Sequence, residues 1–265
     1  PEYSNITSGC WTIDLWNVPQ AGNKDKNDYL GNMSFYACGE DNLNPLYFES
    51  LLLGWKEGTD IRMYGNSITT DSSQYHLRAL SDITIEADYV NWTNWHTTGY
   101  WCTPDSVVHG MIEYFLPGHQ DTAVLIEKVT LWNESEYDLN DFVLGEDIDW
   151  DCNRVDAIDQ AGYEIERKMV YQYDQDFNVY AGLSPYSGYD ADMGGAAVDL
   201  FSETYCIDGY LPDNLYNKLA SLDGIFQIFD DSASGTDYRS LFRFWEGSIG
   251  PDDTITICKV KAVSV

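Results

Sequence analysis

Apolar and polar side chains alternate along most of this chain with the two-residue period of β-strands. Segments rich in β-branched and aromatic residues recur, separated by short stretches of Gly, Pro, Asn, Asp and Ser. This pattern predicts strands over residues 46–55, 107–116, 122–132, 168–173, 178–183, 225–229 and 254–263. One segment, residues 211–222, has helical spacing and the helix-start residues Pro212 and Asp213. The chain is therefore predicted to be all-β, an antiparallel β-sandwich with many strands and one short helix in a connection.

The N-terminal segment has a strand pattern of its own. Trp11, Ile13 and Leu15 alternate with polar residues, and a linker-like stretch, QAGNKDKND, follows over residues 20–28. We therefore predict an N-terminal strand and linker over residues 1–28 and a β-sandwich domain over residues 29–265.

A lone strand cannot bury its apolar face. We expect residues 9–18 to act as an assembly strand, which pairs with a sheet edge of its own sandwich or of a neighbouring subunit. Cys10 would then lock the strand by a disulfide, within one chain or between two.

The charge of the chain is strongly negative, with 14 Lys and Arg against 44 Asp and Glu and a formal net charge of −30. Such a surface repels phosphate backbones and anionic lipid, which argues against binding to nucleic acid. No apolar run approaches the ~18 residues that a membrane-spanning helix needs.

The cysteine count suggests an oxidising compartment. Six cysteines lie far apart in the sequence without a CxxC pair, which favours three disulfides and a secreted or cell-surface protein over zinc or redox chemistry. They are Cys10, Cys38, Cys102, Cys152, Cys206 and Cys258. The first residues do not form a signal peptide, as expected of a mature chain whose leader has been removed. Glycosylation sequons at Asn5, Asn32, Asn91 and Asn133 are compatible with this compartment.

From about residue 28 to 263, four stretches form an ordered pattern: LYFESLLLGW, LIEKVTLWNESEYDLNDFVLGEDIDWD, RKMVYQYDQDFNVYAGL and GSIGPDDTITICKVKAV. The second ends in Asp149-Trp150-Asp151, and the last begins with a Gly-Pro-Asp-Asp turn. The pattern resembles a poorly characterised β-sandwich module of large secreted bacterial proteins. The resemblance implies a sandwich fold and carries no established catalytic residues. The cysteines and the aromatic segment 89–101 depart from the module's pattern.

One acidic stretch is a candidate metal site. Asp147, Asp149 and Asp151 fall at every second residue, so a strand would point all three carboxylates to the same face. With Asp156 and Asp159 they offer hard oxygen ligands suited to calcium, although residues 147–158 lack the Gly and Glu of an EF-hand loop. The alternative is that these Asp residues mark the exit of a strand into solvent, with Trp150 in the core.

An aromatic segment, YVNWTNWHTTGYWC, is a candidate contact surface. Exposed rings there would stack on sugars or anchor a protein interface, whereas the alternative is a loop folded over the sandwich and held by Cys102. Its aromatic residues are Tyr89, Trp92, Trp95, Tyr100 and Trp101.

No recognised catalytic motif is present in the sequence. There is no G-x-S-x-G elbow, the four histidines have no metal-binding spacing, and His109 is interpreted as a structural residue. With this many carboxylates, some pair lies at a glycosidase distance by chance. We therefore expect no enzyme; a glycan-active hydrolase is the third hypothesis.

The leading hypothesis is a non-catalytic extracellular structural protein that self-associates, such as a subunit of a filament, sheath or surface layer. The alternative is a carbohydrate-binding module of a secreted glycan-active system. Calcium is the only cofactor that the sequence suggests, and glycans are the expected partners if the alternative holds.

Overall fold

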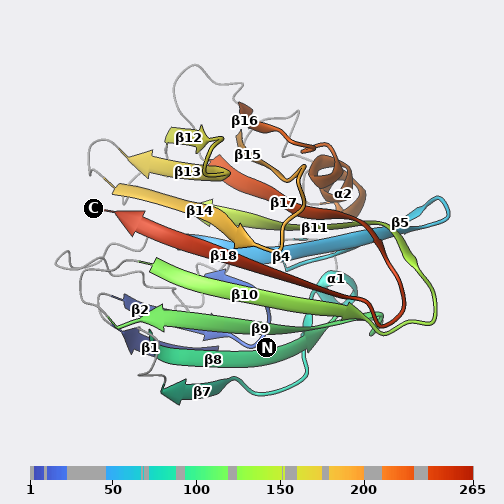
Figure 1. Ribbon diagram of the computed structural model, residues 1–265, viewed down its shortest axis with the longest axis horizontal. Helices are drawn as coiled ribbons and strands as arrows, with labels where there is room; N and C mark the ends of the chain where they lie inside the picture. Colours follow the sequence, from blue (N-terminus) through green and yellow to red (C-terminus); the bar gives the residue numbers. More distant parts are fainter. Residues whose placement is uncertain are drawn as a thin grey trace.

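The computed structural model describes residues 3–8, 11–22, 46–66, 68, 72–87, 93–118, 124–150, 152, 160–174, 179–199, 211–229 and 238–264. Two large sheets lie face to face (Figure 1). Hydrophobic side chains fill the space between them. This is the predicted all-β sandwich.

The first layer is a nine-stranded sheet, which lies toward the viewer in Figure 1. Its strand order is β12 (Gln160–Glu164), β13 (Met169–Asp174), β14 (Val179–Ser187), β18 (Thr254–Ser264), β10 (Val124–Asn133), β9 (Val108–Pro117), β8 (Thr93–Cys102) and β6 (Arg78–Ala79), and β7 (Thr84–Ala87) also pairs with β8. All of these pairs are antiparallel.

The second layer is a seven-stranded sheet behind the first. Its order is β16 (Phe226–Phe229), β15 (Gly194–Asp199), β17 (Tyr238–Ile249), β11 (Leu139–Trp150), β4 (Leu46–Glu57) and β3 (Gln20–Gly22), and β5 (Asp60–Tyr64) also pairs with β4. β15 and β16 are parallel, and the other pairs are antiparallel.

The predicted helix is present as α2 (Pro212–Ala220), and its buried Leu215, Tyr216 and Leu219 face this second sheet. A single helical turn, α1 (Ser72–Tyr75), follows β5 and was not predicted. Among the described residues, no helix has the length and apolar character needed to cross a membrane.

The core lies between the two sheets because each strand presents one face inward. Burial alternates residue by residue along β10, as the two-residue period predicts. Trp55, Trp101 and Trp150 are fully buried in this core. The pattern missed β17, which is buried on both faces over most of its length and therefore lacks a polar face.

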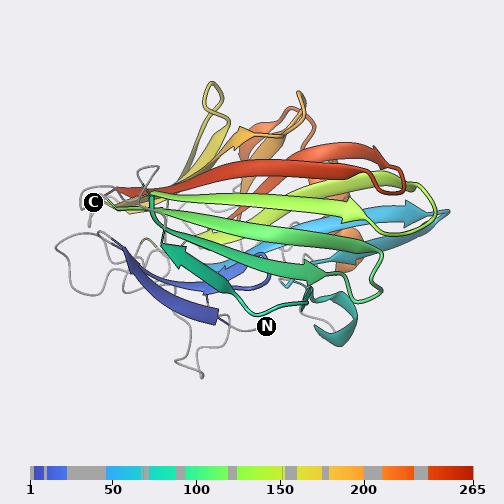
Figure 2. The same cartoon turned by 60° about the horizontal axis from the view of Figure 1, so that its bottom comes forward.

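The N-terminal strand is paired differently from the prediction. β2 (Trp11–Trp16) pairs with β1 (Tyr3–Ser8), and the two form a sheet of their own at the lower edge of the sandwich (Figure 2). Ile6, Leu15 and Val18 reach the main core. The edge strand of the seven-stranded sheet is instead β3, which lies within the predicted linker and pairs with β4. A local hairpin partner for β2 explains the difference, because it satisfies the backbone groups that a lone strand would leave free.

Candidate functional site

Asp147 and Asp149 lie on the same face of β11, as their spacing predicts, but they are not a solvated strand end. Both side chains are buried. Arg239 of β17 contacts both: its Nη1 lies 2.8 Å from Asp147 Oδ2, and its Nε lies 3.3 Å from Asp149 Oδ2. Asp149 and Arg239 are register partners, so the neighbouring strand supplies the cation. Trp150 is in the core, as expected.

The structure does not test the calcium prediction. Asp151, Asp156 and Asp159 lie outside the described residues. Within the described part, no group of three or more His, Cys, Asp and Glu residues is placed to hold a metal ion. Calcium therefore stays a prediction.

The aromatic segment is mostly a regular strand and not a loop. Its residues Thr93–Cys102 form β8, between β7 and β9. Trp101 is fully buried and Trp95 packs partly against the core, whereas Tyr100 is 43% exposed. Tyr89 and Trp92 lie outside the described residues. The period of the strand thus divides these rings between the two faces of the sheet.

Three of the six cysteines can be placed. Cys102 and Cys258 are free thiols, whereas Cys152 is buried with its Sγ 3.5 Å from the carbonyl oxygen of Gln172. Cys10, Cys38 and Cys206 lie outside the described residues. Because Cys102 is on β8, Cys258 on β18 and Cys152 beyond the end of β11, the fold separates the three thiols. The described residues therefore give no support to the prediction that all six pair.

A cluster of charges lies between the two sheets. It contains three carboxylates and two ammonium groups, all at most 1% exposed: Glu49, Glu127, Glu146, Lys259 and Lys261. Lys259 Nζ lies 2.9 Å from Glu127 Oε1 and 3.3 Å from Glu49 Oε1, and it also contacts Glu146. Lys261 contacts Glu49, and its Nζ lies 2.5 Å from Glu127 Oε2.

Burial dominates the electrostatics of this cluster. It raises the pKa of Glu49 and of Glu127, although the two lysines oppose the shift. For Lys259, burial works against the charged form, but the three carboxylates outweigh it and raise its pKa. Fully ionised, the five groups carry one excess negative charge, which favours a shared proton among the carboxylates. Because solvent does not reach these groups, the cluster is a structural network and not an open catalytic pair.

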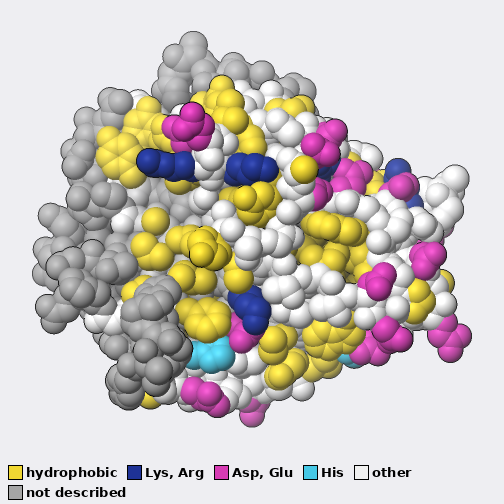
Figure 3. Space-filling view, in the orientation of Figure 1, with side chains coloured by type: hydrophobic (Ala, Val, Ile, Leu, Met, Phe, Trp, Pro, Cys, Tyr) yellow, Lys and Arg dark blue, Asp and Glu magenta, His cyan; other side chains and the backbone are white. Residues whose placement is uncertain are grey.

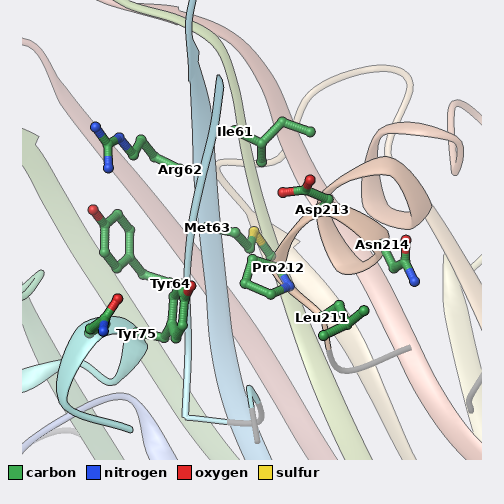
Figure 4. Close-up of a pocket in the computed structure, with 10 residues that line it drawn as sticks. Ile61, Arg62, Met63, Tyr64, Tyr75, Leu211, Pro212, Asp213 and Asn214 are labelled. Atoms are coloured by element: carbon green, nitrogen blue, oxygen red, sulfur yellow. The ribbon is translucent and has the colours of Figure 1, made fainter. Parts of the chain in front are cut away.

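A pocket of about 410 Å³ lies between β5 and the start of α2 (Figure 4). Ile61 and Met63 point toward α2, whereas Arg62 and Tyr64 point to the other side of the strand. Both of these polar groups already have partners: Arg62 binds Glu57, and Tyr64 donates to Asp105 Oδ2 at 2.5 Å. The side of the pocket that faces α2 combines apolar Ile61 and Met63 with Asp213 and Asn214 of the helix.

A more distinctive hollow lies on the outer face of the nine-stranded sheet. It has a volume of about 390 Å³ and crosses β12, β13, β14 and β18. Tyr171, Gly182 and Ala262 are successive register partners there, so a ring stands beside two positions with almost no side chain. We call this hollow the tyrosine groove; its lining residues are Glu164, Arg167, Met169, Tyr171, Tyr180, Ala181, Gly182, Ala262 and Val263.

The rings of the groove are held by one another and by a glycine. Tyr173 and Tyr180 stack, with centroids 5.5 Å apart and planes 9° apart, and Tyr171 lies 5.9 Å from Tyr173. The Tyr171 ring lies against Gly162, where a Cβ would come within 2.3 Å of the ring carbon Cζ. Tyr180 is 40% exposed. The groove therefore offers preordered ring surface to solvent, with Glu164 and Arg167 among the residues that line it.

A second group lies on the same outer face, over β8, β9 and β10. The His96 ring stacks on Phe115, with centroids 4.5 Å apart. His96 Nε2 lies 3.1 Å from Glu113 Oε1, and Lys128 Nζ lies 2.5 Å from Glu113 Oε2. The side chains of His96, Glu113 and Lys128 each keep some exposure, between 10% and 33%.

Sequence reasoning identified neither the tyrosine groove nor the His96 group. The available signal was the spacing of Tyr171, Tyr173 and Tyr180, because alternate residues of β13 share a face. The pairing of β13 with β14, which places Tyr180 beside Tyr173, is a tertiary fact.

No family model matches the chain, and no curated protein matches it. Solved structures show distant similarity. A putative aldose 1-epimerase from Escherichia coli K12 has a TM-score of 0.45 and 8% identity, covering 99% of both chains. The polysaccharide lyase BACCELL_00875 has a TM-score of 0.42 and 10% identity, covering 99% of this chain and 32% of its own. The GH36 α-galactosidase AgaA from Geobacillus stearothermophilus has a TM-score of 0.43 and 8% identity, covering 99% and 40%. The chain thus spans well under half the length of the lyase and of the galactosidase.

Proposed function

We propose that this protein is a carbohydrate-binding β-sandwich and that the tyrosine groove is its binding site. The observation that carries the proposal is the pairing of exposed, preordered tyrosine rings with a hollow above Gly182 and Ala262. Aromatic faces carry partial negative charge and attract the polarised C–H groups of a sugar ring, while the small residues leave room for it.

The charges of the groove favour a neutral glycan. Arg167 and Glu164 offset each other, so the lining has no net charge. The protein as a whole carries a formal charge of −30, which disfavours an anionic polysaccharide. Hydroxyl groups both donate and accept hydrogen bonds, and these two side chains supply one partner of each kind.

Binding is tested by titration calorimetry with cello-, xylo-, manno- and chito-oligosaccharides. Tyr180→Ala should weaken binding roughly threefold to tenfold, corresponding to about 0.5–1.5 kcal/mol. Ala262→Leu should weaken it as well by filling the hollow from an exposed position. Tyr186→Ala is the matched control, because this tyrosine is 76% exposed and does not line the groove.

Gly162→Ala tests whether glycan affinity depends on the position of the Tyr171 ring. Its new methyl group would meet the far end of the Tyr171 side chain, so the ring should move while the strand stays paired. Weaker binding with an unchanged melting temperature supports the proposal. If none of the four sugar series binds, or if the control loses as much affinity as Tyr180→Ala, the groove is not a glycan site.

The structural-protein hypothesis predicted from the sequence has no specific contact among the described residues behind it. A self-associating subunit, secreted or at the cell surface, therefore remains a prediction beside the glycan proposal.

A further inference from the structure

The tyrosine groove opens onto a longer surface on the same sheet. Five successive register partners connect β14 to β8: Ser184, Val260, Ile126, Phe115 and His96. All five are partly exposed. Figure 3 shows hydrophobic side chains over these strands, with a histidine, a basic and an acidic side chain at the lower end. We call this row of five residues the apolar strip after its three central side chains, Val260, Ile126 and Phe115; its two ends are the polar residues Ser184 and His96.

A polar row runs beside the apolar strip. Lys128, Glu113 and Thr98 are register partners two residues further along β10, β9 and β8. Residues two apart on a strand share a face and lie ~6.6–6.8 Å from each other. One line of apolar surface therefore runs next to one line of hydrogen-bonding groups, and both cross the strands.

This geometry matches a linear polymer of sugars. Each sugar ring has apolar C–H faces and hydroxyl groups around its edge, so a chain along the apolar strip would place its hydroxyls over the polar row. In the polar row Glu113 and Lys128 offset each other in charge, as Glu164 and Arg167 do in the groove. From β13 to β8 there are five inter-strand steps, or ~24 Å at ~4.8 Å per step. That length exceeds a single sugar several times over.

We propose that the ligand is a linear neutral polysaccharide, bound across the strands from the tyrosine groove to the Phe115–His96 pair. This inference rests on the proposed function, because the groove supplies one end of the path. It adds the ligand class, a chain of several sugars in place of a mono- or disaccharide, and it assigns Phe115 and His96 to the far end.

The test is a length series by titration calorimetry, from disaccharide to hexasaccharide, in whichever of the four series binds. Hexasaccharide should bind at least about tenfold more tightly than disaccharide. Phe115→Ala should remove most of that gain and leave disaccharide binding unchanged, whereas Tyr180→Ala should weaken both. Phe115→Leu keeps the apolar volume and guards against a folding defect, and it should lose part of the gain with an unchanged melting temperature. Trp132→Ala, on the neighbouring strand β10 and outside the strip, is the matched control for loss of a large ring.

The outcomes separate the two proposals. If the affinity does not increase beyond the disaccharide, or if Phe115→Ala does not lower the affinity for hexasaccharide, the extended path is wrong. The groove then remains the proposed binding site. The absence of binding at any length overturns both. Light scattering on the unliganded protein gives a further check: a dimer that Phe115→Ala dissociates would assign the strip to a second copy of this chain and overturn the glycan path.

Discussion

Lys259 and Glu127 face each other in the centre of the sandwich. They are register partners on β18 and β10, with Nζ and Oε1 2.9 Å apart, and both side chains are 0% exposed. The same row continues through Tyr114 to Thr97, so four polar residues on adjacent strands meet inside the core. Glu49 and Glu146 reach this row from the opposite sheet. The cluster therefore joins the two layers through ionic contacts, where most sandwiches rely on apolar packing.

Removing one ammonium group should destabilise the protein strongly. Lys259→Met leaves three buried carboxylates with one cation, and breaking a buried ion pair costs about 3–5 kcal/mol. Lys56→Met is the control, because Lys56 pairs with Asp141 at 3.3 Å on the surface and such pairs contribute about 0–1 kcal/mol. Urea unfolding of both variants measures the difference. Equal losses would contradict the role assigned to the cluster.

Glu49→Gln should stabilise the protein at neutral pH. Burial raises the pKa of Glu49 above 4.5, so the folded state favours the protonated form. The contribution of Glu49 to the free energy of unfolding is then complete below pH 4.5, and it is lost as the pH rises through the folded-state pKa. An amide does not titrate, and it leaves two carboxylates facing two lysines.

We expect the melting temperature of Glu49→Gln to exceed that of the native protein at pH 8 by roughly 2–4 °C, equivalent to about 1 kcal/mol. The difference should shrink toward pH 4. Calorimetric scans from pH 4 to pH 8 test this, and a variant that is less stable at pH 8 would show that the carboxylate is required in its charged form.

Loss of Arg239 should destabilise the folded protein strongly, because this side chain neutralises the two buried Asp residues of β11. Arg239→Met leaves Asp147 and Asp149 without this cation, at a cost of about 3–5 kcal/mol. Added calcium should recover part of the lost melting temperature in this variant, because two carboxylates then lie side by side without the guanidinium.

Calcium should also be tested on the native protein. A rise in its melting temperature with calcium, if Asp149→Asn abolishes that rise, would establish the site predicted from the sequence. Identical curves in EDTA and calcium for both proteins would exclude it.

The N-terminal hairpin should be required for folding. Leu15 is fully buried in the main core, so Leu15→Ala should cost about 2–5 kcal/mol. Leu80→Ala is the control at a leucine that is 53% exposed. Deletion of residues 1–20 should unfold the protein. A folded, monomeric product would instead favour exchange of this segment between subunits in an assembly.

Much of the fold could be predicted from the sequence because periodicity is a local property. The alternation along β10 marks both the strand and its buried face, and Pro212 with the leucine spacing marks α2. The shared face of Asp147 and Asp149 follows from strand geometry alone. Several strands were not predicted, among them β5, β12, β15 and β17; β17 lacks a clear alternation because it is buried on both faces over most of its length.

The sites depended on which strands meet, and that is decided by tertiary structure. Strand β18 shows why: the charge of Lys259 and Lys261 would favour the solvent face, yet these two lysines share the inner face with Ile257 and Val263. The fold tolerates them there because carboxylates from three other strands neutralise them, and one of these, Glu49, is 210 residues away from Lys259. Burial of charge is favourable only when partners arrive from elsewhere in the chain. The sequence by itself therefore determined many of the strands and the alternation of faces along them, whereas the charged core and the tyrosine groove arose only when distant strands were brought into register.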